Sequence, residues 1–276
     1  MLRTRVATAS VLLAVAVGAL VWSSTAFAVV VTALLGLALT EWLQLIGTAR
    51  LVSMTVALLV CAALLAVVFA SWSTIDAVVL PLGVVAAAIW LMIAAVLVQP
   101  NAMTLRLPRI PGMVLAVVLV VAAWFALMRF LSQGVLMLFS VLFVVWIADT
   151  AAYFVGRAFG RRKLAPHISP GKTWAGVIGA ILAVLIVAFT IWQLIPAARI
   201  YSNDLFAAIG PAFALLLLAL LVASSIVGDL YESLLKRQAG VKDSGQLLPG
   251  HGGVLDRLDA MVPVLPLAVV IQWLVR

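Results

Sequence analysis

Long apolar stretches, separated by short polar segments, dominate the chain. A membrane-spanning helix needs roughly 20 mostly apolar residues, because each residue adds about 1.5 Å across a hydrocarbon core about 30 Å thick. The pattern therefore predicts an all-α, polytopic transmembrane helical bundle of about nine spans. The first stretch is short and weakly separated from the second, so eight or ten helices stay open. The nine stretches cover approximately residues 8–21, 25–46, 51–70, 75–98, 113–131, 135–154, 174–195, 205–227 and 260–275.

The N-terminal stretch also has the outline of a cleavable signal peptide. Arg3 and Arg5 precede an apolar run that reaches the small-residue sequence Ala26-Phe27-Ala28. That run is long for a signal peptide, and the apolar chain resumes at once with Val29. We therefore expect the segment to be retained as a helix.

Basic residues gather on one side of the predicted bundle. If the N-terminus lies inside, nine crossings place 14 of the 17 Lys and Arg residues on that side and leave only Arg129, Arg199 and Arg276 outside. Cytoplasmic loops of membrane proteins carry such an excess of positive charge. The asymmetry predicts a cytoplasmic N-terminus, with all the long polar connections on the cytoplasmic side. We see no internal repeat of the kind expected for an inverted-repeat transporter.

Composition supports the same class. Hydrophobic residues make up 67% of the 276 residues and charged residues 9%, against about 45–50% and about 25% in soluble domains. The formal net charge of +8 is explained by the positive-inside rule and by anionic lipid headgroups, so no nucleic-acid partner is expected. The single cysteine, Cys61, lies in an apolar run, which excludes a disulfide framework.

A polar stripe follows the eighth apolar stretch. Asp229, Glu232, Ser233 and Lys236 recur at i, i+3, i+4 and i+7, so on a helix they share one face. Weak salt bridges at a solvated helix end would explain the stripe without a function. An ionised carboxylate at a membrane boundary is costly unless it is paired, however, and this favours a functional role for Asp229.

The next segment, residues 242–253, combines several glycines with a proline and predicts a tight, irregular loop. Successive backbone N–H groups in such loops can hold phosphate oxygens. His251 could donate to a phosphate, act as an acid or base, or stabilise the turn. The only other histidine, His167, lies in a different loop, so a histidine-rich zinc site is not expected. Four basic residues flank the loop and favour phosphate contact: Lys236, Arg237, Lys242 and Arg257.

Two acids open the last apolar stretch. Asp256 and Asp259 are three residues apart, so on a helix their carboxylates share a face. Favourable interaction with the helix dipole would be enough to explain them. Together with Asp229 they would form an all-oxygen cluster, which suits Mg²⁺ held by one or two carboxylates and by substrate phosphates. Metal binding is the interpretation that we favour.

The sixth stretch ends in a second polar stripe and a basic loop. Asp149, Tyr153 and Arg157 lie at i, i+4 and i+8, and residues 161–173 follow as the loop. Its Gly171-Lys172-Thr173 resembles part of a P-loop, but Pro166 stands where that motif requires glycine and no strand is expected before it. The basic residues of this loop are explained equally well by anion binding and by the usual excess of positive charge in cytoplasmic loops. Glu41, near the inner end of the second stretch, could join the site or form a structural pair.

The spacing of these motifs resembles a known family. The run from Ser233 to Asp259, 27 positions that include Lys242-Asp243 and residues 249–259, resembles the signature of phosphatidate cytidylyltransferases. Residues 149–157 and 169–174 look similar to the same family, although relatives often carry Glu or Gln where this chain has Ala175. The resemblance covers the C-terminal half, so we expect N-terminal transmembrane helices at 1–134 and a catalytic region at 135–276.

The resemblance implies that CTP and phosphatidic acid react to CDP-diacylglycerol and pyrophosphate. It also implies a multi-pass protein of a bacterial inner membrane, an active site that faces the cytoplasm, and a need for Mg²⁺ with a potassium ion beside it. The sequence gives no oligomeric state, and a homodimer stays open. By position, the implied metal ligands are Asp229, Asp256 and Asp259, which with Lys236 and Lys242 form the implied catalytic set. The implied substrate-binding residues are Lys236, Arg237, Lys242, Asp243, His251, Gly252, Gly253, Arg257 and Ser169. Lys172 and Arg157 are our candidates for binding the lipid phosphate.

Two other functions share these features. An ion-coupled transporter could use Glu41, Asp149 and Asp229 as coupling acids, but its site should lie near the bilayer midplane, whereas these acids fall near cytoplasmic helix ends. A CTP-dependent lipid or polyprenol kinase would share the metal and the nucleotide and would transfer a different phosphoryl group.

Overall fold

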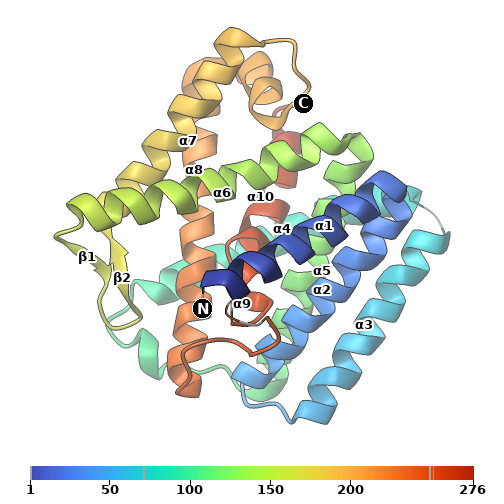
Figure 1. Cartoon of the computed structure of the whole chain (residues 1–276), viewed down its shortest axis with the longest axis vertical. Helices are drawn as coiled ribbons and strands as arrows, with labels where there is room; N and C mark the ends of the chain where they lie inside the picture. Colours follow the sequence, from blue (N-terminus) through green and yellow to red (C-terminus); the bar gives the residue numbers. More distant parts are fainter. Residues whose placement is uncertain (1, 71, 249, 251) are drawn as a thin grey trace.

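Helices that follow the apolar stretches build almost the whole fold (Figure 1). The computed structural model describes residues 2–70, 72–248, 250 and 252–276. The long helices are α1 (Leu2–Trp22), α2 (Ser24–Leu45), α3 (Arg50–Ala70), α4 (Ser73–Leu97), α5 (Arg109–Gln133), α6 (Val135–Phe159), α7 (Trp174–Leu194), α8 (Tyr201–Ala239) and α10 (Met261–Leu274). The short elements are η1 (Ala102–Thr104), β1 (Lys163–Ala165), β2 (Ser169–Thr173) and α9 (Leu255–Leu258).

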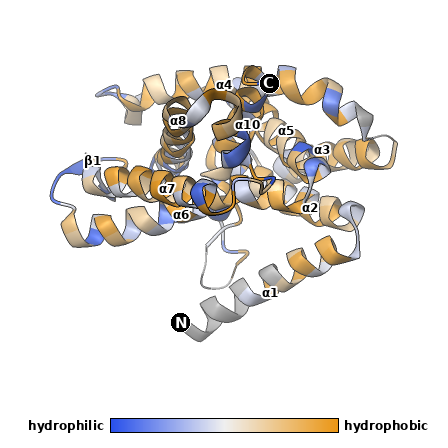
Figure 2. Cartoon of the chain, turned by 90° about the horizontal axis from the view of Figure 1, so that it is seen from above, coloured by the Kyte–Doolittle hydropathy of each residue, from blue (hydrophilic) through white to orange (hydrophobic). Residues whose placement is uncertain are grey.

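Among the described residues, eight helices are long and apolar enough to cross a membrane, and they match the second to ninth predicted stretches. The first stretch forms α1, which contacts α2 and then extends away from the rest of the bundle (Figure 2). Apolar side chains cover the outward helix faces, as surfaces that contact lipid require. The chain is therefore an all-α, multi-pass membrane protein. The number of spans and the cytoplasmic N-terminus stay predictions.

The longest helix, α8, carries the predicted polar stripe toward one end of the bundle. Its 39 residues are interrupted at Gly210, whose φ of 74° and the following Pro211 break the helical path. It ends at Gly240, which adopts the left-handed conformation (φ 72°) that commonly closes helices. At its polar end, Gly228 lies against Pro263 of α10, and Asp229 faces residues of α6 and α7.

The basic loop after α6 forms a short hairpin that the sequence did not predict. Strands β1 and β2 pair in antiparallel register, with Lys163 opposite Thr173 and Ala165 opposite Ser169. The Oγ1 of Thr173 accepts a hydrogen bond from Gly176 N (3.1 Å) and caps α7. Lys172 therefore lies on a strand that leads directly into a helix, with no intervening phosphate-binding loop.

The two ends of the chain share one core. α2 contacts α5, α8 and α9, and buried hydrophobic residues from Phe27 to Ile271 belong to a single cluster. The last span is divided, because α9 ends at Leu258 and α10 begins at Met261. The boundary proposed at residue 134 concerns function rather than packing and stays a prediction.

Candidate active site

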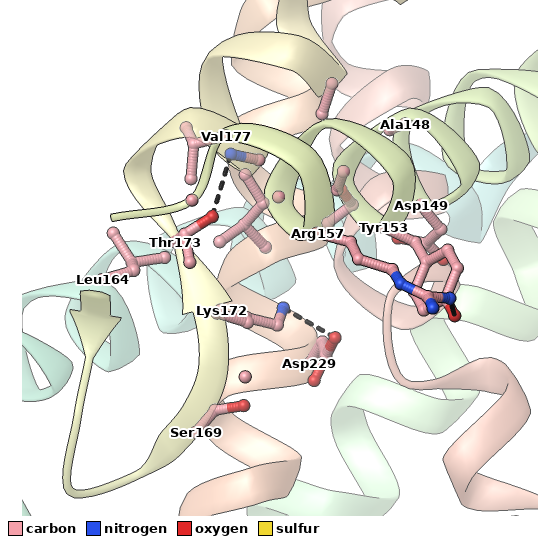
Figure 3. A pocket seen from close by; sticks show the side chains of 18 of the residues that line it. Ala148, Asp149, Tyr153, Arg157, Leu164, Ser169, Lys172, Thr173, Val177 and Asp229 are labelled. Carbon is pink, nitrogen blue, oxygen red and sulfur yellow. Dashed lines mark hydrogen bonds and ion pairs between the residues drawn. The ribbon is translucent and has the colours of Figure 1, made fainter. Parts of the chain in front are cut away.

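A cavity of about 620 Å³ opens between α6, the hairpin, α7 and α8 (Figure 3). Its wall combines small and apolar residues with several polar side chains. The polar and charged lining residues are Asp149, Tyr153, Arg157, Lys163, Ser169, Lys172, Thr173, Ser225 and Asp229. This cavity thus gathers four of the predicted site residues, namely Arg157, Ser169, Lys172 and Asp229.

An ion pair joins two walls of the cavity. The Nζ of Lys172, on β2, lies 2.6 Å from Oδ2 of Asp229, on α8 (Figure 3). The side chains keep 23% and 34% of their surface exposed, so the pair is accessible from the cavity. Ser233 Oγ donates to the other oxygen of Asp229 (3.4 Å). The carboxylate of Asp229 is therefore paired and also open to the cavity.

The three residues of the stripe on α6 line the same cavity and so share one face of the helix, as their spacing predicted. Arg157 donates to the hydroxyl of Tyr153 (3.2 Å). Asp149 lies one turn before Tyr153 on α6 and interacts electrostatically with Asp229, Lys172 and Arg257. The sequence identified Asp149 as part of the stripe and as a coupling acid of the alternative transporter, but assigned it no role in nucleotidyl transfer. An acid near the inner end of a span is the signal that could have placed it in the site.

Lys236 and Asp256 belong to a second, more closed cluster. The Nζ of Lys236 lies 2.6 Å from Glu232 Oε2 and 2.6 Å from Asp256 Oδ1, and these three side chains are only 14%, 4% and 7% exposed. The other oxygen of Asp256 accepts hydrogen bonds from Ser244 N (3.0 Å) and Gly253 N (2.8 Å), with Ser244 Oγ also at 3.0 Å. Asp256 therefore ties α8 to both ends of the glycine-rich loop.

The glycines of this loop close around Asp256. Gly252 has a φ of 82°, and a Cβ there would lie 2.8 Å from Asp256 Oδ2. A Cβ at Gly253 would overlap Ser244 Oγ and Glu41 Oε2. Both positions therefore require glycine. The N–H of Gly253, predicted to bind substrate, serves Asp256 in this structure.

The remaining predicted residues lie around the two clusters. Lys242 and Asp243 are exposed. Arg237 donates from Nε to the carbonyl of Ile168 (3.4 Å), which links α8 to the hairpin. Arg257 is exposed and acts electrostatically on Asp149. The prediction for His251 lies outside the described residues.

The three aspartates predicted to share a metal are not gathered into one preformed cage. Among the described residues, no group of three or more His, Cys, Asp or Glu side chains is arranged to hold a metal ion. Asp256 is engaged by Lys236, whereas Asp259 interacts electrostatically with Asp229 and Asp149. The cavity therefore offers oxygen ligands from only a few carboxylates. Mg²⁺ uses such a small donor set when phosphates of the substrate complete its coordination.

Comparison with known proteins connects this geometry to a family. The model of the cytidylyltransferase family matches residues 3–275. A phosphatidate cytidylyltransferase of Pseudomonas aeruginosa is 37% identical over 99% of this chain and 97% of that protein. Proteins of the same name from Haemophilus influenzae and Bacillus subtilis are 47% and 44% identical over 49% and 52% of this chain, and these matches cover 44% and 50% of the two relatives. The chain belongs to the cytidylyltransferase family.

Proposed function

We propose that this protein transfers a cytidylyl group from CTP to phosphatidic acid and releases pyrophosphate. The observation that carries the proposal is the cavity in which Lys172 and Arg157 meet Asp229 at the end of the transmembrane bundle. The relative from Pseudomonas aeruginosa, which shares 37% identity over nearly the whole chain, carries the name of this activity.

The reaction joins two anions, so charge must be neutralised before they meet. An oxygen of the lipid phosphate attacks the α-phosphorus of CTP, the bond from that phosphorus to the bridging oxygen breaks, and pyrophosphate leaves with the bonding electrons. Enzymes accelerate such transfers mainly by positioning the reactants and stabilising charge. Lys172 and Arg157 supply positive charge inside the cavity, where the lower polarity strengthens their effect.

The cavity suits the lipid substrate in particular. α6 and α7 form two of its walls, and their outer surfaces expose apolar side chains such as Phe154 (64% exposed) and Ile178 (55%). Acyl chains can therefore stay in the bilayer while the phosphate enters beside Lys172, Arg157 and Ser169. The exposed Lys242 and Arg237 are assigned to the phosphates of CTP, which arrives from water, together with the glycine-rich loop.

Asp229 and Asp259 would hold Mg²⁺ together with phosphate oxygens of the substrates. When bound, the ion supplies positive charge at the phosphates. Asp256 was predicted as a third ligand, but its contacts with Lys236, Ser244 and Gly253 favour a role in holding the loop. The potassium ion implied by the resemblance stays a prediction, as does a homodimer. We also assign the protein to a bacterial inner membrane, with the cavity toward the cytoplasm, because the basic hairpin borders it.

Two positions of the radioactive label in CTP test the reaction. Purified protein in detergent–phosphatidate micelles with Mg²⁺ is given CTP labelled at the α- or the γ-phosphorus. Cytidylyl transfer moves the α-label into the lipid fraction and the γ-label into pyrophosphate. A lipid kinase would instead move the γ-label into lipid. An ion-coupled transporter would move neither label, and that result would refute the proposal.

A further inference from the structure

Glu41 is a buried carboxylate from the half of the chain that the signature does not cover. It lies near the end of α2, and its side chain is 4% exposed. It takes no part in the ion pairs that Lys172 and Lys236 form with Asp229, Glu232 and Asp256. A buried charge without hydrogen bonds would be very costly, so its partners indicate what it does.

The hydrogen bonds that Glu41 accepts within the described part of the chain come from the glycine-rich loop and the residues that follow it. Its Oε1 accepts from Val254 N (3.1 Å), and its Oε2 accepts from Leu255 N (2.8 Å). Ser244 Oγ lies 3.0 Å from the same Oε2. Residues 244 and 254–255 stand at opposite ends of the loop, so one carboxylate holds both ends together.

The loop backbone is also shaped to fit this carboxylate. A Cβ at Gly245 would overlap Oε1 of Glu41, and a Cβ at Gly253 would overlap Oε2. At Gly245, the three nearest atoms all belong to Glu41. Two glycines of the loop are therefore explained by the need to approach Glu41 closely.

Ser244 connects Glu41 to the cluster around Lys236. Its hydroxyl lies 3.0 Å from both Glu41 Oε2 and Asp256 Oδ2. A serine has one hydroxyl proton, and Asp256 Oδ2 already accepts from the backbone of Ser244 and Gly253. Donation to Glu41 therefore satisfies both carboxylates. Moving Glu41 would release Ser244 and loosen Asp256.

We infer that Glu41 is a positioning residue that fixes the glycine-rich loop, and through Ser244 the Asp256–Lys236 pair, in the geometry that turnover requires. The inference deepens the proposed function and rests on it. Glu41 does not line the cavity that contains Lys172 and Asp229. It should therefore affect the catalytic rate and leave the binding of phosphatidate unchanged.

The test is Glu41→Gln, which keeps the size of the side chain but turns an amide group toward backbone donors. We expect kcat to fall about 10- to 100-fold, because hydrogen bonds to a buried charge are lost, while KM for phosphatidate stays within about twofold. Hydrogen exchange, followed by mass spectrometry, should accelerate in peptides that contain Val254 and Leu255. Ser244→Ala should show the same pattern with a smaller loss, because it removes one of the three contacts.

Gln44→Ala is the matched control, because Gln44 lies three residues further along α2 and its side chain is exposed. It should leave both rate and exchange unchanged. Normal kcat and normal exchange in Glu41→Gln would overturn the inference, and so would faster exchange throughout α8 and α10, which would indicate a general role in packing. The exchange measurement needs no substrate. If the wild-type protein formed no CDP-lipid, the proposed function would fail while local acceleration at residues 254–255 would still support the contact made by Glu41.

Discussion

Two polar clusters at the same end of the bundle differ in how far their side chains are exposed and in which elements their ion pairs join. The cavity cluster, Lys172 with Asp229 and Asp149, keeps 23% and 34% of its ion-paired side chains exposed. The loop cluster, Lys236 with Glu232 and Asp256, exposes 14% or less of each side chain. An exposed pair can exchange partners with a substrate at little cost, whereas a buried pair is expensive to separate. We therefore expect the predicted site residues to divide into a part that meets substrate and a part that holds the loop.

The largest effect is expected in the loop cluster. Asp256→Asn removes the charge that Lys236 and the amides of Ser244 and Gly253 share, and breaking a buried pair typically costs about 3–5 kcal/mol. Turnover should be abolished while the protein still inserts into the membrane, and raising Mg²⁺ should not restore activity. Activity assays at increasing Mg²⁺ check this. Recovery at high Mg²⁺ would instead make Asp256 a metal ligand.

A second large effect tests whether the loop must close tightly. Gly253→Ala places a Cβ where Ser244 Oγ and Glu41 lie, so we expect turnover to fall at least about 10-fold and the melting temperature to drop. Gly18→Ala in α1 is the control, because a Cβ there has no neighbour within 4 Å. Equal activity of the two variants would show that the loop can accommodate a side chain at residue 253.

The cavity cluster should respond differently. Lys172→Met removes a charge that faces substrate, and we expect kcat/KM for phosphatidate to fall about 100-fold with a melting temperature near that of the wild type. Arg129→Met disrupts a more exposed pair with Asp76 (2.9 Å; side chains 26% and 61% exposed) away from the cavity and should leave kcat/KM unchanged. Strong destabilisation by Lys172→Met would remove the contrast between the two clusters.

The smallest effect is expected at the rim of the cavity. Tyr153→Phe removes one exposed hydrogen bond to Arg157. Because such contacts contribute on the order of 1 kcal/mol or less, kcat/KM should change by less than about fivefold. A steady-state titration of phosphatidate measures this. A loss as large as that of Lys172→Met would instead place the phenol in contact with the reacting groups.

The sequence predicted the local features well and the long-range ones poorly. Long apolar stretches located the helices, and the spacing of polar residues located the stripes on α6 and α8, because these features depend on residues close together in the chain. The sequence did not show that Asp229 and Asp256 belong to different clusters, because their partners, Lys172 and Lys236, come from different elements. The hairpin was missed because its strands are short and contain Pro170 and Gly171. Glu41 could be recognised as a buried acid, but its partners lie more than 200 positions away.

Chemical labelling of the two lysines tests the division between the clusters most directly. The purified protein is treated with an amine acetylating reagent in the presence and absence of phosphatidate, and modification is quantified by mass spectrometry. We expect Lys172 to react in the absence of lipid and to be protected by phosphatidate, while Lys236 resists modification under both conditions. Equal reactivity of Lys236 and Lys172, or a Lys172 that phosphatidate does not protect, would contradict it.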